Sequence, residues 1–330
     1  MTATVPAPPR SAPIEPRPIT DAPTTGDRVF RAVVVAGAWV SVAILGLILV
    51  FLLQKAWPAV SAIGLGTFLK TFEWSPDATP SHFGIAAVLV GTIVIALVAL
   101  VVAVPLAVGA ALFVNEYLPP RLARPVTTMI DLLAAVPSLI YGMWGLYWLQ
   151  SRMNGTSRWL TDHASFIPIF RTDRPVFGSS MFVAGLVVAV MILPIVASVS
   201  REVFAQVPRV TCEGALALGG TRWGMIRKVV LPFGRSGVLG AAMLGLGRAL
   251  GETIAVVLIL SINFRVTSHL LEPGGGSVAA LIANQFGEAG EHGRGALIAA
   301  GLALFVLTLV VNMGARLVVN RSHALRSVDR

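Results

Sequence analysis

The sequence predicts an all-α, polytopic membrane protein with six transmembrane helices. Of its 330 residues, 55% are hydrophobic and only 12% are charged, whereas a soluble domain carries roughly 25% charged residues because its surface must face water. The apolar residues gather in six long runs, and the basic residues that give the net charge of +9 stand mostly between them. This distribution indicates a lipid bilayer as the surroundings. A basic patch on a soluble fold, the usual sign of a nucleic-acid partner, is absent from the sequence.

The first segment of the chain cannot build a core. Residues 1–27 contain seven prolines among small polar residues, a composition typical of disorder. We therefore expect a cytoplasmic tail over residues 1–27, a transmembrane domain over residues 28–320 and a second cytoplasmic tail over residues 321–330.

Each of the six apolar runs is long enough to cross the hydrocarbon. The first, Ala32–Leu53, spans about 33 Å as a helix and is too long for a signal-peptide core, so we expect it to be retained. The other five spans are predicted near Ile85–Val114, Val126–Leu149, Met181–Ser200, Gly237–Ile262 and Ala296–Val319. Several of these spans are expected to be broken at Pro105, Pro137 and Pro194.

The basic residues predict the orientation of these spans. If the N-terminus is cytoplasmic, sixteen Lys and Arg residues lie on the cytoplasmic side and eight on the other, as the positive-inside rule expects. Both termini are then cytoplasmic. The outer segments are long enough to form a docking surface; they are Gln54–Phe83, Gln150–Ser180 and Asn263–Gly295.

Little in the sequence indicates an enzyme. The phosphate-cradling pattern Gly-x-x-x-x-Gly-Lys does not occur, so the chain is expected to have no ATPase site of its own. The five histidines are scattered without metal-ligand spacing, and Cys212 is the only cysteine. We expect no cofactor, no metal and no catalytic residues. Asp131 is expected near the start of the third span, where the positive end of a helix stabilises a carboxylate.

The cytoplasmic segment 201–235 between the fourth and fifth spans carries a distinctive pattern. Residues 212–218 can form a short helix, and Gly219 and Gly220 are suited to end it because glycine adopts the left-handed cap conformation. Its anchors are Glu213, Ala215, Gly219, Leu231 and Pro232. This spacing resembles the coupling motif of ABC-importer permeases, which opens Glu-Ala-Ala and ends Ile-x-Leu-Pro, with Gly214 and Val229 as departures. The resemblance implies that these anchors contact an ATPase subunit.

The fifth span contains two charged residues. Arg248 would lie about 16 Å from a helix start near Gly237, roughly at the bilayer centre, and Glu252 follows four residues later on the same helix face. An ionised side chain at that depth requires a partner or an aqueous path. Two interpretations stay open: a self-neutralising structural pair, or groups that serve a transported anion, for which a forked guanidinium is suited.

Small residues surround these charges and are expected at a subunit seam, where helices approach closely. They are Gly240, Ala241, Gly245, Gly247, Gly251 and Ala255.

Residues 244–256, Leu-Gly-Leu-Gly-Arg-Ala-Leu-Gly-Glu-Thr-Ile-Ala-Val, resemble the fifth-span signature of PstC-type permeases of the bacterial Pst phosphate ABC importer. Residues 131–138, 141–145 and 201–208 resemble the same family. The resemblance implies a type I ABC-importer permease that conducts phosphate across a bacterial inner (plasma) membrane. It also implies a PstA-type permease, PstB-type ATPases and an external PstS-type binding protein as partners, and roles for Arg248 and Glu252 in phosphate passage.

Three alternatives remain. A sulfate or molybdate permease would share the coupling motif. A self-contained secondary anion transporter would also use intramembrane charges, but no internal repeat is found and residues 213–232 would have no role. A membrane-embedded enzyme has no nucleophile or metal cluster in its favour.

Overall fold

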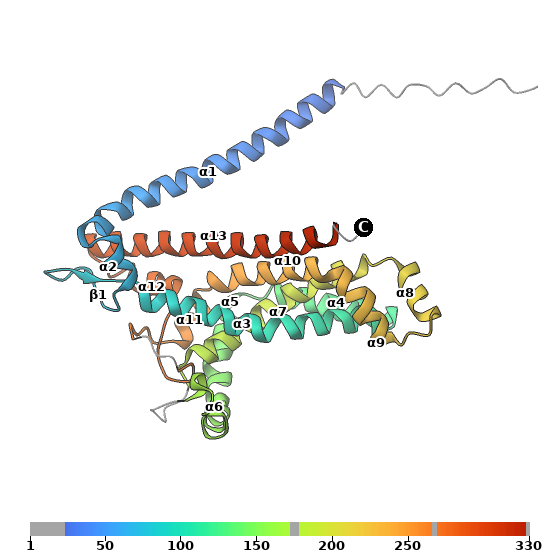
Figure 1. Ribbon diagram of the computed structural model, residues 1–330. Coiled ribbons are helices and arrows are strands. Elements are labelled where there is room, and N and C mark those ends of the chain that lie inside the picture. Colours follow the sequence, from blue (N-terminus) through green and yellow to red (C-terminus); the bar gives the residue numbers. More distant parts are fainter. Residues whose placement is uncertain (1–23, 172–177, 266–268, 328–330) are drawn as a thin grey trace, which may run out of the picture. The chain divides into compact units, whose positions relative to one another are not determined.

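The structure is a computed structural model that describes residues 24–171, 178–265 and 269–327. Most of the expected first tail, residues 1–23, and the end of the second, residues 328–330, lie outside the described residues. The helices run in the following order (Figure 1): α1 (Thr25–Ile63), α2 (Leu65–Lys70), α3 (Ala86–Leu112), α4 (Pro120–Ala134), α5 (Ser138–Trp144), α6 (Gln150–Ala164), α7 (Met181–Ala205), α8 (Arg209–Ala217), α9 (Arg222–Met225), α10 (Leu231–Leu250), α11 (Ile254–Ile259), α12 (Val278–Gln285) and α13 (Glu291–Ser327).

Several of these helices are extended by short turns that are wider than those of an α-helix, and one separate turn is tighter. π-Helical turns follow α3, α5 and α9, and a 3₁₀ turn lies between α6 and α7. Their bounds are η1 (Phe113–Tyr117), η2 (Gly145–Leu149), η4 (Ile226–Val230) and η3 (Pro168–Phe170). The first outer segment adds a two-stranded antiparallel ribbon of β1 (Trp74–Ser75) and β2 (His82–Phe83) to the otherwise helical fold.

Five helices in the described part of the chain are long and apolar enough to span a membrane, and a bent pair can supply a sixth span. This agrees with the expected all-α polytopic class. The bent pair replaces the single third span expected at Val126–Leu149, because α4 and the α5–α6 segment meet at 90°. The break falls at residues 135–137, and proline disfavours helical geometry in the residue before it.

Only one of the three prolines expected to break a span does so. Pro137 lies at the start of α5, whereas Pro105 and Pro194 lie inside the continuous helices α3 and α7. Neighbouring helices can compensate for the lost backbone hydrogen bond, so a membrane helix tolerates an internal proline. At the α4–α5 bend, the Tyr141 hydroxyl donates to the carbonyl of Leu133 at 2.7 Å, which holds the two helices at their angle.

The chain divides into two compact units, residues 1–50 and 51–330. In the first unit, the described part of α1 carries large apolar side chains that are exposed, among them Phe30 and Trp39. In water such a surface would be unfavourable. An apolar helix with every face exposed is suited to lipid or to another membrane chain.

In the second unit, α7 is the central helix. It packs against α3, α4 and α10, and its buried residues include Val187, Met191 and Ile192. Glycine allows the close contacts: a Cβ atom on Gly185 would come within 2.5 Å of Val98 on α3. Dense packing of this kind holds α3, α7 and α10 as one body.

A second core joins the ends of the first and last spans. Ala56, Phe68, Phe83, Leu281 and Leu297 are buried together in it. The turn between the two strands is tied to the start of α13, because the Asp77 carboxylate accepts backbone N–H bonds from Gly290 at 3.0 Å and Gly293 at 2.8 Å. A carboxylate at a helix N-terminus is stabilised by the free N–H groups there.

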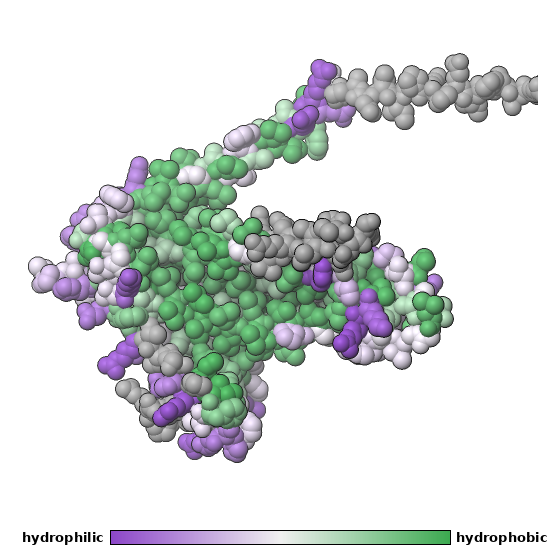
Figure 2. Space-filling view, viewed as in Figure 1, coloured by the Kyte–Doolittle hydropathy of each residue, from purple (hydrophilic) through white to green (hydrophobic). Residues whose placement is uncertain are grey.

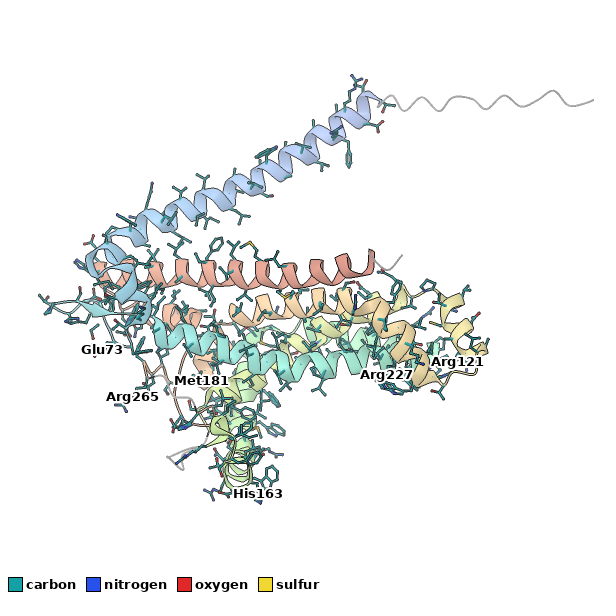
Figure 3. All side chains as sticks on the ribbon, viewed as in Figure 1. Glu73, Arg121, His163, Met181, Arg227 and Arg265 are labelled. Atoms are coloured by element: carbon teal, nitrogen blue, oxygen red, sulfur yellow. The ribbon has the colours of Figure 1, made fainter. Side chains whose placement is uncertain are left out.

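Charged residues of the second unit gather at its ends, and an apolar band lies between them (Figure 2). Arg121 and Arg227, which were expected to be cytoplasmic, lie at one end, and Glu73 and Arg265, which were expected to be external, lie at the other (Figure 3). This separation suits a bilayer around the band.

Candidate functional site

The fifth span is two helices and not the single one expected at Gly237–Ile262. α10 ends at Leu250, and α11 begins at Ile254. Side chains at the break replace helical hydrogen bonds: the Thr253 hydroxyl donates to the Gly251 carbonyl at 3.0 Å, and the Glu252 carboxylate accepts from the Ala255 N–H at 3.2 Å. Inside a bilayer, non-helical backbone is tolerated only within protein or along a water-filled cavity.

Glu252 therefore does not share a helix face with Arg248, contrary to the sequence-based expectation. Its side chain is 8% exposed and caps the first turn of α11. Within the described residues, no ion pair joins it to Arg248. The physical reason is the break itself, because the i,i+4 relation holds only while the helix continues.

Arg248 lies in the last turn of α10 with its side chain exposed. A cation is favoured there by the negative end of the helix dipole. Among the described residues, its guanidinium makes no hydrogen bond and no ion pair. It lines an open cavity of about 540 Å³ between α7, α10 and α13, together with Ile195, Gly240, Met243, Leu244, Gly247 and Asn312.

Asn312 was missed by the sequence reasoning. It is an amide near the middle of α13, in a run that is otherwise almost wholly apolar. A polar side chain in such a run is costly unless it meets a partner, and this was the signal that could have found it. The sequence could not show that Asn312 and Arg248 line one cavity, because more than sixty residues separate them.

The small residues around Arg248 face two different environments. Gly245 is buried against α7, and a Cβ atom there would come within 2.8 Å of Val196; Ala241 is fully buried. Gly240 and Gly247 meet nothing within 4 Å and line the cavity. The first pair brings α10 close to α7, and the second pair leaves room beside Arg248.

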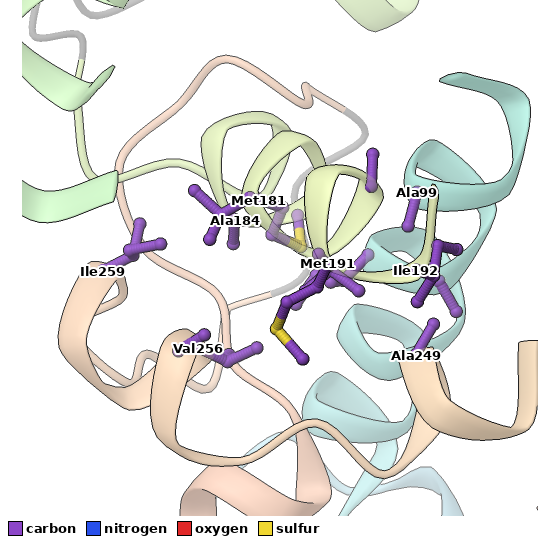
Figure 4. Close-up of a cluster of buried hydrophobic side chains, with 14 of the residues drawn as sticks. Ala99, Met181, Ala184, Met191, Ile192, Ala249, Val256 and Ile259 are labelled. Atoms are coloured by element: carbon purple, nitrogen blue, oxygen red, sulfur yellow. The ribbon is translucent and has the colours of Figure 1, made fainter. Parts of the chain in front are cut away.

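Both halves of the broken span are anchored on α7. Ala249 of α10 and Val256 and Ile259 of α11 are buried in one cluster with Met191 and Ile192 (Figure 4). The break is therefore held in place from both sides by apolar packing. This places the cavity, on the exposed side of α10, next to a rigid support.

Asp131 does not cap the start of a helix. It lies in the last turn of α4, and its carboxylate accepts a hydrogen bond from the Ser198 hydroxyl on α7 at 2.9 Å. The correction follows from the helix start, which lies at Pro120 and not near Val126. Asp131 thus joins two helices.

The coupling segment contains the short helix α8, which ends at Ala217, just before the two glycines that were expected to end it. Gly219 has a φ of 82°. Its N–H donates a hydrogen bond to the Leu216 carbonyl at 2.9 Å, and the Gly220 N–H donates one to the Ala215 carbonyl at 3.2 Å. This pair of bonds is a Schellman motif, which ends a helix at a left-handed residue. A side chain with a Cβ atom would be strained at this position.

α8 has one packed face and one free face. Ala215 and Cys212 pack against a buried cluster that contains Phe204, Met225, Ile226 and Val230. Glu213 is exposed, and so are three apolar side chains, Val210 at 79%, Leu216 at 40% and Leu218 at 91%. Burial, with the negative charges of Glu116 and Glu213 as lesser causes, raises the pKa of the Cys212 thiol.

The remaining anchors, Leu231 and Pro232, begin α10. The Leu231 N–H bonds the carbonyl of Ile226, five residues back. This wider turn is followed by Pro232, which has no N–H to donate. Leu231 packs against the same cluster as Ala215, so the structure brings the two ends of the motif together. From Arg222 to Leu250 the chain is one helical rod that leads from α8 to Arg248.

Comparisons with known proteins agree with this architecture. Residues 103–323 match the family of binding-protein-dependent transport system inner membrane components. A bacterial alginate ABC transporter, solved in complex with an alginate pentasaccharide-bound periplasmic protein, has a similar fold: the TM-score is 0.59 at 16% identity, over 88% of this chain and 93% of that chain. The family match therefore places the chain among the inner membrane components of binding-protein-dependent transport systems, and its fold is that of an ABC-transporter permease.

More similar relatives narrow the class. The phosphate transport system permease protein PstC 2 of Mycobacterium tuberculosis is 45% identical over 295 residues, which cover 88% of this chain and 91% of that protein. PstC of Xylella fastidiosa is 43% identical over 274 residues, 82% of this chain and 84% of that protein. The chain belongs to the PstC family of permease proteins.

Proposed function

We propose that this chain is the channel-forming subunit of an ATP-driven phosphate importer. One observation carries the proposal: in a chain of the PstC family, the guanidinium of Arg248 makes no hydrogen bond or ion pair with the described residues and lines an open cavity beside a broken span. An arginine stays protonated and offers a fork of donors that fits the oxygens of an oxyanion. Its placement is suited to binding a passing anion.

Glu252 stands at the break, outside the residues that line the cavity. One of its carboxylate oxygens accepts from the Ala255 N–H, which leaves the other for a second donor. We propose that this oxygen accepts a hydrogen bond from protonated phosphate as the anion passes the break. Fully ionised sulfate has no proton to donate, so this contact would favour phosphate.

We further propose that α8 receives the closing motion of a separate PstB-type ATPase. Its exposed face combines the carboxylate of Glu213 with the apolar side chains of Val210 and Leu218, a mixture that is suited to a protein partner. The rod from Arg222 to Leu250 can carry a displacement at this end to the cavity. The sequence lacks a phosphate-binding loop of its own, so the ATPase must be another chain.

The other proposed partners follow from open surfaces. The cavity beside Arg248 is open in this chain, and we propose that a PstA-type permease closes it in a heterodimer. The external end, which carries the two-stranded ribbon, would receive a PstS-type binding protein. Both termini would then be cytoplasmic, in keeping with the distribution of basic residues.

Reconstitution tests the proposal. The chain is placed in proteoliposomes with its proposed partner permease and ATPase, and uptake of labelled phosphate is followed with ATP inside and binding protein outside. We expect uptake that requires both additions and is not competed by sulfate. Uptake without the ATPase would indicate a secondary transporter, and uptake of sulfate or molybdate in preference to phosphate would indicate another oxyanion permease.

A further inference from the structure

The cavity beside Arg248 has one other hydrogen-bonding side chain among its described lining residues. Asn312 reaches it from α13, a helix that packs against α10. The rest of the lining consists of glycines and the apolar side chains Ile195, Met243 and Leu244. An oxyanion that left water for this cavity would therefore have two side chains with N–H donors.

Asn312 has no hydrogen-bond partner among the described residues. The contrast within α13 is clear, because the hydroxyl of Thr308, one turn earlier, donates to the carbonyl of Leu304 at 2.8 Å. Thr308 is thus satisfied by its own helix. The amide of Asn312 has two donors and an acceptor to satisfy, and none of them is bonded within the described part of the chain.

We propose that Asn312 is a second ligand of the transported oxyanion and shares its site with Arg248. The two groups have complementary roles. The guanidinium supplies a positive charge and a fork of donors, and the neutral amide supplies a further donor without the increase in anion affinity that a second charge would bring. A weakly held anion can leave, as conduction requires. The inference rests on the proposed function and adds a residue to its site.

The volume of the cavity fits this assignment. About 540 Å³ corresponds to roughly eighteen water molecules at ~30 Å³ each, so an oxyanion enters with part of its hydration shell. Gly240 and Gly247 keep this space open, because a Cβ atom at either position would meet nothing within 4 Å. An amide and a guanidinium that face such a space are accessible from water.

Uptake by the assembled complex, normalised to copurified subunits, compares three variants. Asn312→Leu keeps the volume and removes the donors, and we expect roughly a tenfold loss, the size of one hydrogen bond to a charged group. Asn312→Asp should be more severe, because it places a negative charge beside the anion. Thr308→Val is the matched control and should transport normally. If Asn312→Asp lowers uptake less than Asn312→Leu, the side chain bonds a neighbouring helix and the proposal is wrong.

A second measurement does not depend on transport. In a Cys212→Ser background, Asn312→Cys should react faster with an anionic methanethiosulfonate than with a cationic one, and Arg248→Gln should remove this preference. Thr308→Cys should show no preference. Absence of reaction at position 312, or equal rates for the two reagents, would contradict the proposal.

The outcome also separates this inference from the proposed function. If Arg248→Gln stops uptake while Asn312→Leu does not, the phosphate-permease assignment stands and the role of Asn312 is refuted. If neither variant affects uptake, the cavity is not on the anion path, and the proposed roles of Arg248 and Asn312 are both refuted.

Discussion

At the scale of single residues, Arg248 and Glu252 occupy different structural settings. Glu252 is buried and caps α11, whereas Arg248 is exposed to a cavity without a partner among the described residues. Their relation is therefore not that of a buried salt bridge, in which removing one charge strands the other. Each residue should be separable from the other by mutation.

The double variant Arg248→Gln with Glu252→Gln tests this separation. Glutamine at 252 keeps an oxygen that can accept from the Ala255 N–H, so the cap should survive. Arg248→Gln should lower phosphate uptake by roughly 10- to 100-fold, because one charge-assisted interaction is lost, and the double variant should not recover. Arg248→Lys, which keeps the charge without the fork, should be intermediate. Near-normal uptake by the double variant would show a purely structural pair.

At the scale of elements, α8 is a short helix whose end is fixed by one residue. The left-handed conformation of Gly219 turns the chain so that Gly220 and Thr221 lead into α9. α8 has only nine residues, and a helix this short is marginally stable without tertiary contacts. Its shape therefore depends on this cap and on the buried cluster against which Ala215 packs.

Gly219→Val should leave the protein inserted but lower its ATP-driven uptake severalfold. A β-branched residue in the left-handed region costs at least 1–2 kcal/mol, which distorts the end of α8. Gly214→Ala is the matched control: Gly214 has ordinary helical geometry and open space around it, so alanine should stabilise α8 by about 1 kcal/mol. ATPase activity and uptake in proteoliposomes measure both. Wild-type uptake by Gly219→Val would refute the coupling role of α8.

At the scale of the whole molecule, the second unit has two charged ends and an apolar band between them. We expect the end with Arg227 to face the cytoplasm and the end with Glu73 and Arg265 to face outwards (Figure 3). Impermeant thiol labelling of intact cells tests this orientation. His163→Cys should be labelled from outside, and Arg227→Cys only after the membrane is opened.

The native cysteine gives little background in that experiment. The raised pKa of Cys212 keeps its side chain in the protonated, poorly reactive thiol form at neutral pH. The substitution Cys212→Ser removes any labelling that remains at this position. Labelling of position 227 in intact cells, or no labelling of position 163, would reverse the orientation.

The sequence by itself determined the class, the apolar runs from which the spans are built and the end of α8, because these depend on local properties. Run length and hydropathy report the spans, and glycine spacing reports the end of α8. The tertiary structure decided what local patterns cannot express: that Pro137 breaks a helix while Pro105 and Pro194 do not, that the fifth span is broken after Leu250, and that Asn312 and Arg248 line one cavity. Each depends on how neighbouring helices replace lost hydrogen bonds or leave space, and that is a property of packing between segments distant in the chain.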